Sequence, residues 1–273
     1  MEFKPAYPED NNNVSHNNPL REFVVLLTGV LLVCVAVFVV SGWLVDRAVL
    51  WISPKMEAQI FTALSPAVKD SVGQRSSGED VLQQLVDGLG SCIDVGYPVK
   101  VELVTTETAN ALALPGGRII VFSGILDKIQ SENGLAFVLA HELAHFKHRD
   151  HLSGMGRGIV LTAMTAFLTG SDSGLTRLVT PAVSLGTASY SRSREARADS
   201  LALRALHCRY GHVGGATEFF RAMQNEERGR GIASYFASHP EAVERIQQLE
   251  VLQRSQGYTT EAVTSLPERL MQK

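Results

Sequence analysis

Two histidines and a glutamate form the stretch of this sequence with the clearest capacity for chemistry. His141, Glu142 and His145 stand in the pattern HELAH. Residues four apart lie one turn apart on the same helix face, so both imidazoles can reach one metal ion, and the glutamate can act on a water beside it. A zinc hydrolase needs these groups and a third protein ligand.

Two downstream carboxylates offer that third ligand. Glu195 and Asp199 are four residues apart in a run with helical spacing, so they share a face. One could ligate the metal while the other accepts a hydrogen bond from a ligating histidine and fixes its tautomer. Taken alone, the pair is equally typical of a solvated helix face with Glu/Arg pairs. The upstream HELAH favours the metal-binding interpretation.

A long helix must position the two histidines. Ser131 is a typical N-cap, and Glu132 follows in the first turn, where the helix dipole favours an acidic residue. Apolar residues then recur at helical spacing, which predicts one half-buried helix from Ser131 to about His151. Arg149 and Asp150 are expected to cap its end or to support neighbouring loops. Before this helix, alternating segments around the turn at 115–117 predict a small antiparallel sheet packed on helices.

The combined pattern resembles a known family. HExxH at 141–145 followed by ExxxD at 195–199 looks like the gluzincin pattern. More specifically, the chain resembles the membrane-associated zinc endopeptidases that include HtpX, the mitochondrial OMA-type proteases and the CaaX prenyl endopeptidase. Three further stretches carry the resemblance: NALALPGG at 110–117, YSRSR at 190–194, and SHP at 238–240 followed by Arg245-Ile246.

The resemblance implies an α+β, mostly helical, zincin-like (gluzincin) catalytic domain with one Zn²⁺ per chain. By position, His141, His145 and Glu195 would bind the metal, Glu142 would be the general base, and Asp199 would support a ligating histidine. The metal would lower the pKa of a water towards neutrality. Glu142 would take the proton of this water as it attacks a peptide carbonyl, and would deliver it to the leaving amine.

Three further residues are candidates for contacts with the reacting atoms. Tyr190, Arg192 and His239 could by type stabilise the oxyanion. His239 comes from a distant segment, and we expect it either to guard the fourth metal position or to contact the tetrahedral intermediate. A histidine packed at a helix N-terminus before Pro240 is an equally good interpretation.

The segment before the metal helix suggests how substrate is held. The resemblance favours an edge strand, formed by Asn110, Ala111, Leu112 and Ala113, along which an extended or unfolded peptide binds through main-chain hydrogen bonds. A purely structural hairpin is the alternative. The expected partners are therefore protein or peptide substrates.

The N-terminal region predicts a membrane anchor. Residues 23–45 carry no charge and would span about 34 Å as a helix, enough for a bilayer core. The 1–21 leader is polar, rich in asparagine and predicted to be disordered, which favours a retained single-pass anchor at 22–45 over a cleaved signal peptide. Flanking Lys and Arg residues are balanced, so the orientation is open. A large trailing domain favours the periplasmic side of a bacterial inner membrane, and a cytoplasmic domain is the alternative.

The remainder of the chain predicts one catalytic domain at 46–260 and a C-terminal tail at 261–273. The apolar stretch from Gly158 to Gly170 is short for a span, and it predicts a buried or membrane-apposed helix, or a lid. Cys92 and Cys208 could form a disulfide in an oxidising compartment, and two buried free thiols are at least as well supported. A net charge of −3 gives no basic surface for nucleic acid.

The sequence therefore predicts a membrane-anchored zinc endopeptidase. The resemblance implies a role in quality control of misfolded or membrane-associated proteins. A narrow processing protease and a catalytically weak chaperone-like or scaffold protein on the same fold are the alternatives. The intact Glu142 favours an active enzyme, and the sequence does not indicate an oligomeric state.

Overall fold

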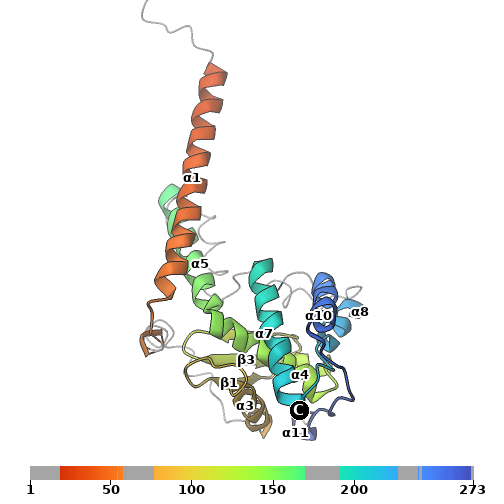
Figure 1. Cartoon of the computed structure of the whole chain (residues 1–273). Helices are drawn as coiled ribbons and strands as arrows, with labels where there is room; N and C mark the ends of the chain where they lie inside the picture. The colour runs from red at the N-terminus through yellow and green to blue at the C-terminus, as the bar shows by residue number, and fades with distance from the viewer. Residues whose placement is uncertain are drawn as a thin grey trace, which may run out of the picture.

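The computed structural model describes residues 19–53, 55–57, 59, 77–169, 191–226, 239 and 242–271. Most of them are helical, and a three-stranded sheet accompanies the helices (Figure 1), which confirms the predicted α+β, mostly helical class. The helices include α1 (Pro19–Val49), α3 (Ser77–Gly90), the 3₁₀ helix η2 (Ser123–Asp127), α4 (Glu132–His148), α5 (Asp150–Thr169), α7 (Arg192–Tyr210), α8 (Glu218–Glu226), α10 (Ala242–Gln256) and α11 (Glu268–Met271).

The sheet is mixed, in the order β1-β3-β2. Strand β2 (Ala111–Leu114) and strand β3 (Arg118–Phe122) are antiparallel across the turn at 115–117, where Gly116 and Gly117 have φ of 86° and 73°. Strand β1 (Lys100–Val104) is parallel to β3. The prediction of an antiparallel sheet is therefore wrong for one of its two strand pairs. The chain reverses between β1 and β2 and leaves the central position to β3, and an alternating pattern cannot reveal that pairing.

Helix α4 lies at the centre of the fold. Ser131 caps its N-terminus by accepting a hydrogen bond from the backbone N–H of Gly134 at 2.9 Å. Every residue from Asn133 to Phe146 is buried, because α4 packs against α3, α7, α8 and β2. The prediction of a half-buried helix is therefore wrong. The polar face that carries the two histidines points to α7 and not to solvent.

Helix α4 also ends earlier than its sequence predicts. Arg149 has a left-handed backbone conformation with φ of 57°, and its N–H bonds to the carbonyl of Phe146. A new helix, α5, begins at Asp150. The expected single helix from Ser131 to His151 is therefore two helices with a break between them, and the break turns Asp150 back towards the side chain of His145.

The predicted anchor is a longer helix than its uncharged core. Helix α1 covers Pro19–Val49, and within the described part of the chain it is the helix long and apolar enough to cross a membrane, with a mean hydropathy of 3.2. Its apolar side chains are exposed, as contact with lipid would require. Helix α5 lies beside the C-terminal part of α1 (Figure 1). Gly156 allows this approach, since a Cβ atom there would lie 2.5 Å from Val45 Cγ1.

The described part of the C-terminal segment is attached to the domain. The backbone carbonyl of Thr264 accepts a hydrogen bond from the backbone N–H of Glu132, and the N–H of Leu266 donates one to the backbone carbonyl of Gln130. Leu266 and Leu270 are buried in the core cluster. The described part of this segment therefore supports the start of α4.

Cys92, after α3, and Cys208, in α7, form a disulfide across 116 residues. We expect the double variant Cys92→Ser/Cys208→Ser to lose about 2–4 kcal/mol of unfolding free energy, since the crosslink restricts the unfolded chain. Chemical denaturation with and without reductant measures this difference. Cys34→Ser is the control and should leave the midpoint unchanged. Equal midpoints for oxidised and reduced wild type would contradict the prediction.

Candidate metal centre

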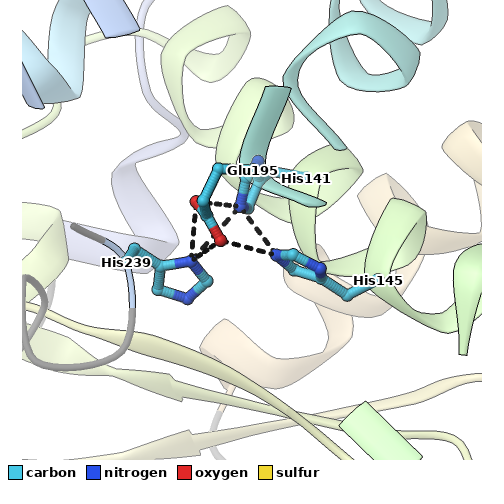
Figure 2. Close-up of side chains that lie close together, drawn as sticks. All are labelled: His141, His145, Glu195 and His239. Atoms are coloured by element: carbon cyan, nitrogen blue, oxygen red, sulfur yellow. Dashed lines mark hydrogen bonds and ion pairs between the residues drawn. The ribbon is translucent and has the colours of Figure 1, made fainter. Parts of the chain in front are cut away.

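Four buried side chains from three separate segments converge at one point (Figure 2). They are His141 and His145 from α4, Glu195 from the first turn of α7, and His239. Each offers one ligand atom, and these atoms all lie within 4.8 Å of one another. None of the four residues is more than 2% exposed.

His141 is held from both ring nitrogens by residues of α7. Its Nδ1 lies 2.9 Å from Asp199 Oδ1, and its Nε2 lies 3.4 Å from Glu195 Oε2. Glu195 and Asp199 share a face of α7 because they are one turn apart. The structure therefore brings the carboxylate pair against the histidine in the arrangement that the spacing suggests.

His145 has a matching carboxylate partner. Its Nδ1 lies 3.1 Å from Asp150 Oδ2, and its Nε2 lies 3.5 Å from Glu195 Oε1. Sequence reasoning assigned Asp150 to the helix end and missed this contact. The break at Arg149 creates it, and a residue five positions after His145 could not reach it on a continuous helix. If both histidines bind a metal, each is expected to have an outer carboxylate, and this requirement could have indicated a partner for His145.

The donor set fits a metal ion. With each Nδ1 proton directed at a carboxylate, neither Nε2 of the neutral imidazoles carries a proton. These two Nε2 atoms face each other at 3.0 Å, beside the Glu195 carboxylate (Figure 2). Two lone pairs so close require a shared proton or a cation between them. Two imidazoles and a carboxylate are the ligands of many catalytic zinc sites.

The electrostatics of the cluster support this interpretation. Burial alone would lower the pKa of His145, but its hydrogen bonds with Asp150 and Glu195 outweigh burial and raise the pKa to about 9. Burial and Arg245 also oppose the charged form of His141, yet Glu195 and Asp199 raise its pKa. Burial would raise the pKa of Glu195, and the neighbouring His239 and His141 instead hold it well below its ordinary value. The site thus favours positive charge next to an ionised carboxylate.

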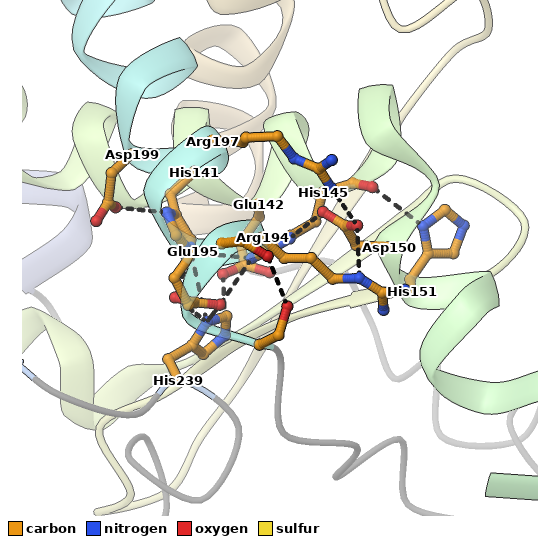
Figure 3. Close-up of polar contacts among 12 residues, drawn as sticks. His141, Glu142, His145, Asp150, His151, Arg194, Glu195, Arg197, Asp199 and His239 are labelled. Atoms are coloured by element: carbon orange, nitrogen blue, oxygen red, sulfur yellow. Dashed lines mark hydrogen bonds and ion pairs between the residues drawn. The ribbon is translucent and has the colours of Figure 1, made fainter. Parts of the chain in front are cut away.

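Glu142 has a different environment from its neighbours. It is fully buried, and neither of its carboxylate oxygens accepts a hydrogen bond within the described part of the chain. Its Oε1 lies 3.6 Å from His239 Nε2 (Figure 3). A buried carboxylate without a hydrogen-bond donor is costly unless something else uses it, so Glu142 is available to a water or substrate at the cluster.

His239 is brought into the cluster by a segment far along the chain. Its Nδ1 lies 3.1 Å from each oxygen of Glu195 and 3.4 Å from His141 Nε2. Burial lowers the pKa of His239 despite the nearby Glu195. His239 therefore lies beside the other three residues of the cluster.

Arg245 is a site residue to which sequence reasoning gave no role. Its guanidinium donates two hydrogen bonds to Asp199, at 2.9 and 2.6 Å, and its Nη1 lies 2.8 Å from Glu195 Oε2. The Arg245 side chain is 3% exposed, and its guanidinium carbon lies 4.3 Å from the centre of the Phe220 ring. Arg245 fixes both carboxylates of α7, and it arrives from α10, which no local spacing could indicate.

The other predicted contacts lie differently. Arg192 begins α7 with an exposed side chain, whereas the cluster is buried. Tyr190 lies outside the described residues. Ala111, Leu112 and Ala113 lie in β2, one of the two edge strands of the sheet, and Asn110 directly precedes it. Helix α4 packs against this strand, so the edge lies next to the helix that carries the cluster.

A buried HExxH helix that faces a glutamate from a second helix defines a metal-dependent peptidase of the zincin class. Residues 77–253, more than half of the chain, match the family model "Peptidase family M48". The chain therefore belongs to peptidase family M48, and it is a metalloprotease.

Curated relatives agree with this assignment. The chain is 30% identical to "Metalloprotease YcaL" of Escherichia coli (strain K12) over 173 residues, which cover 62% of this chain and 67% of YcaL. It is 31% identical to a "Protease HtpX homolog" of Salinibacter ruber over 203 residues, 62% of this chain and 73% of that protein. It is 32% identical to "Mitochondrial metalloendopeptidase OMA1" of Schizosaccharomyces pombe over 161 residues, 55% of this chain and 45% of that protein. The match spans less than half of the yeast protein.

Proposed function

We propose that the protein is a membrane-anchored zinc endopeptidase in which His141, His145 and Glu195 hold one zinc ion. The observation that carries this proposal is the pairing of each histidine Nδ1 with its own carboxylate, Asp199 and Asp150. This pairing leaves both Nε2 atoms directed at Glu195. Outer carboxylates that fix the tautomer and raise the basicity of the ligand are typical of zinc sites.

Glu142 is the general base of this proposal. When bound, zinc supplies Lewis-acid chemistry and lowers the pKa of a water towards neutrality. Glu142 accepts a proton from the attacking water and delivers it to the leaving nitrogen. Its buried carboxylate has both oxygens available for this transfer within the described part of the chain. Asp199 and Arg245 hold Glu195 and His141 in place during the reaction.

The substrate is proposed to be an extended or unfolded protein segment. The support is the edge position of β2, which leaves one side of Ala111–Leu114 without a strand partner among the described residues. A peptide can add to such an edge through main-chain hydrogen bonds, a mode that reads backbone more than side chains. This low selectivity suits quality control of misfolded or membrane-associated proteins.

The proposed location of the catalytic domain is the periplasmic side of a bacterial inner membrane. Helix α1 supports membrane attachment by its length and its exposed apolar surface. The disulfide between Cys92 and Cys208 supports an oxidising compartment, since such bonds are rare in the cytosol.

His239 is proposed to occupy the fourth metal position and to block it until it moves away. We expect His239→Ala to weaken zinc binding, because one imidazole donor is lost, and to increase hydrolysis at saturating zinc several-fold. Zinc titration and casein hydrolysis on the full chain measure both effects. Unchanged zinc affinity and unchanged activity would remove His239 from the site, and lost activity at saturating zinc would assign it to substrate contact.

Hydrolysis of casein by the purified full-length chain and by Glu142→Gln tests the proposed function. Hydrolysis by wild type alone, with zinc bound to both proteins, supports the peptidase. Equal and negligible hydrolysis would favour a scaffold role on the same fold.

A further inference from the structure

The end of the anchor helix contacts the polar network around the metal ligands. Asp46 lies in the last turn of α1, directly after the uncharged segment. Its Oδ1 accepts a hydrogen bond from Arg194 Nη2 of α7 at 2.9 Å, and its Oδ2 accepts one from Arg157 of α5. One carboxylate of the anchor therefore binds a guanidinium from each of two other helices.

Arg194 continues this network towards the metal ligands (Figure 3). Its Nε lies 3.4 Å from Asp150 Oδ1, and the other oxygen of Asp150 lies 3.1 Å from His145 Nδ1. Arg194 also directly precedes Glu195 in the first turn of α7. Its side chain is only 13% exposed, and that of Asp150 only 3%. Four side chains from α1, α7, α5 and α4 thus connect the membrane anchor to a metal ligand.

We propose that Asp46 is a positioning residue of the metal centre, acting through Arg194 and Asp150 on His145. The inference rests on the proposed zinc site. Asp46 holds Arg194, which in turn holds Asp150 at the angle where it accepts the Nδ1 proton of His145. The same contact fixes the first turn of α7, which carries Glu195. Attachment of the anchor to the domain is then a condition for a well-formed metal site.

The alternative role for Asp46 is attachment of α1 to the domain alone. Ion pairs at partly exposed positions contribute little to stability, and the Asp46 side chain, which pairs with Arg157 and Arg194, is 36% exposed. Loss of outer residues that orient a metal ligand instead costs about 10- to 100-fold in metal affinity or activity. The affinity for zinc therefore distinguishes positioning from simple attachment.

The test uses the full-length chain in detergent with three substitutions: Asp46→Asn, Asp46→Glu and Glu22→Gln. Glu22→Gln is the matched control, because it removes a charge at the other end of α1. We expect Asp46→Asn to weaken zinc binding about tenfold, the lower end of the range for outer residues. Asp46→Glu should restore most of the affinity, and Glu22→Gln should equal wild type. Competition with a chromogenic chelator measures zinc affinity, and casein hydrolysis separates kcat from KM.

A second comparison shows whether the effect passes through Arg194. In that case Asp46→Asn/Arg194→Gln should bind zinc no more weakly than Arg194→Gln alone, because both substitutions interrupt one path. Wild-type affinity in Asp46→Asn, while wild type binds zinc stoichiometrically, would overturn this inference alone. A wild-type chain that binds no zinc would overturn the proposed function and this inference with it. Asparagine and glutamate are polar and similar in size to aspartate at a partly exposed position, so we expect both variants to fold.

Discussion

Glu142→Gln is expected to reduce casein hydrolysis by about 10²- to 10⁴-fold, the usual contribution of a general acid–base residue. Glutamine fills the same buried space but cannot accept the proton of the attacking water. The Glu142 side chain is not among the four candidate ligands His141, His145, Glu195 and His239. Zinc content should therefore equal that of wild type, so the loss should appear in kcat and not in metal occupancy.

The control for this substitution lies on the same helix. Glu132→Gln makes the same chemical change in the first turn of α4, where Glu132 accepts a hydrogen bond from Tyr210. It should keep wild-type activity per folded molecule. An inactive Glu142→Gln chain that retains zinc should also capture substrates, which mass spectrometry can identify. Hydrolysis by Glu142→Gln at the wild-type rate would show that another group acts as the base.

Arg245→Met is expected to lower the unfolding free energy of the metal-free protein by about 3–5 kcal/mol, the usual cost of removing one partner of a buried ion pair. Methionine is unbranched and flexible like the aliphatic part of arginine, and it suits an apolar contact with Phe220. It leaves the buried carboxylate of Asp199 without the two hydrogen bonds that it accepts from Arg245. Burial would raise the pKa of Asp199, and Arg245 and His141 now hold it low. Without Arg245, less opposes the effect of burial on the Asp199 carboxylate, and the folded state becomes less stable.

The chain offers an exposed pair for comparison. Arg221 Nη2 lies 2.7 Å from Glu250 Oε1. The Arg221 side chain is 59% exposed, and that of Glu250 is 37% exposed. Arg221→Met should cost at most about 1 kcal/mol, as is usual for surface ion pairs. Denaturant titrations of the two variants and wild type measure the difference. A similarly small loss of unfolding free energy in both variants would mean that Arg245 does not offset the cost of burying the carboxylates of Glu195 and Asp199.

The sequence was most informative where the chemistry depends on local spacing. His141 and His145 share a face of α4, and Glu195 and Asp199 share a face of α7, because four residues make about one helical turn. These two short-range patterns indicated the candidate ligands, and together with the stretches at 110–117, 190–194 and 238–246 they carried the resemblance to the family. The class of the fold was an implication of the family resemblance that these patterns help to carry.

The features that spacing could not predict all depend on tertiary structure. Asp150 reaches His145 because helix α4 ends just before Arg149. The sequence gives no clear sign that this arginine adopts a left-handed backbone conformation. Arg245 reaches Asp199 from another helix, 46 residues along the chain. The parallel pairing of β1 with β3 similarly results from a chain reversal whose path no residue pattern specifies. Long-range partners therefore had to come from the structure.

The metal content of the purified full-length chain tests the central claim most directly. Elemental analysis after dialysis against metal-free buffer should find about one zinc ion per chain in wild type, as a two-histidine, one-glutamate site requires. It should find a large loss in His145→Ala, which removes one proposed ligand. A folded wild-type protein without stoichiometric metal would contradict the account, as would one whose zinc content does not change in His145→Ala.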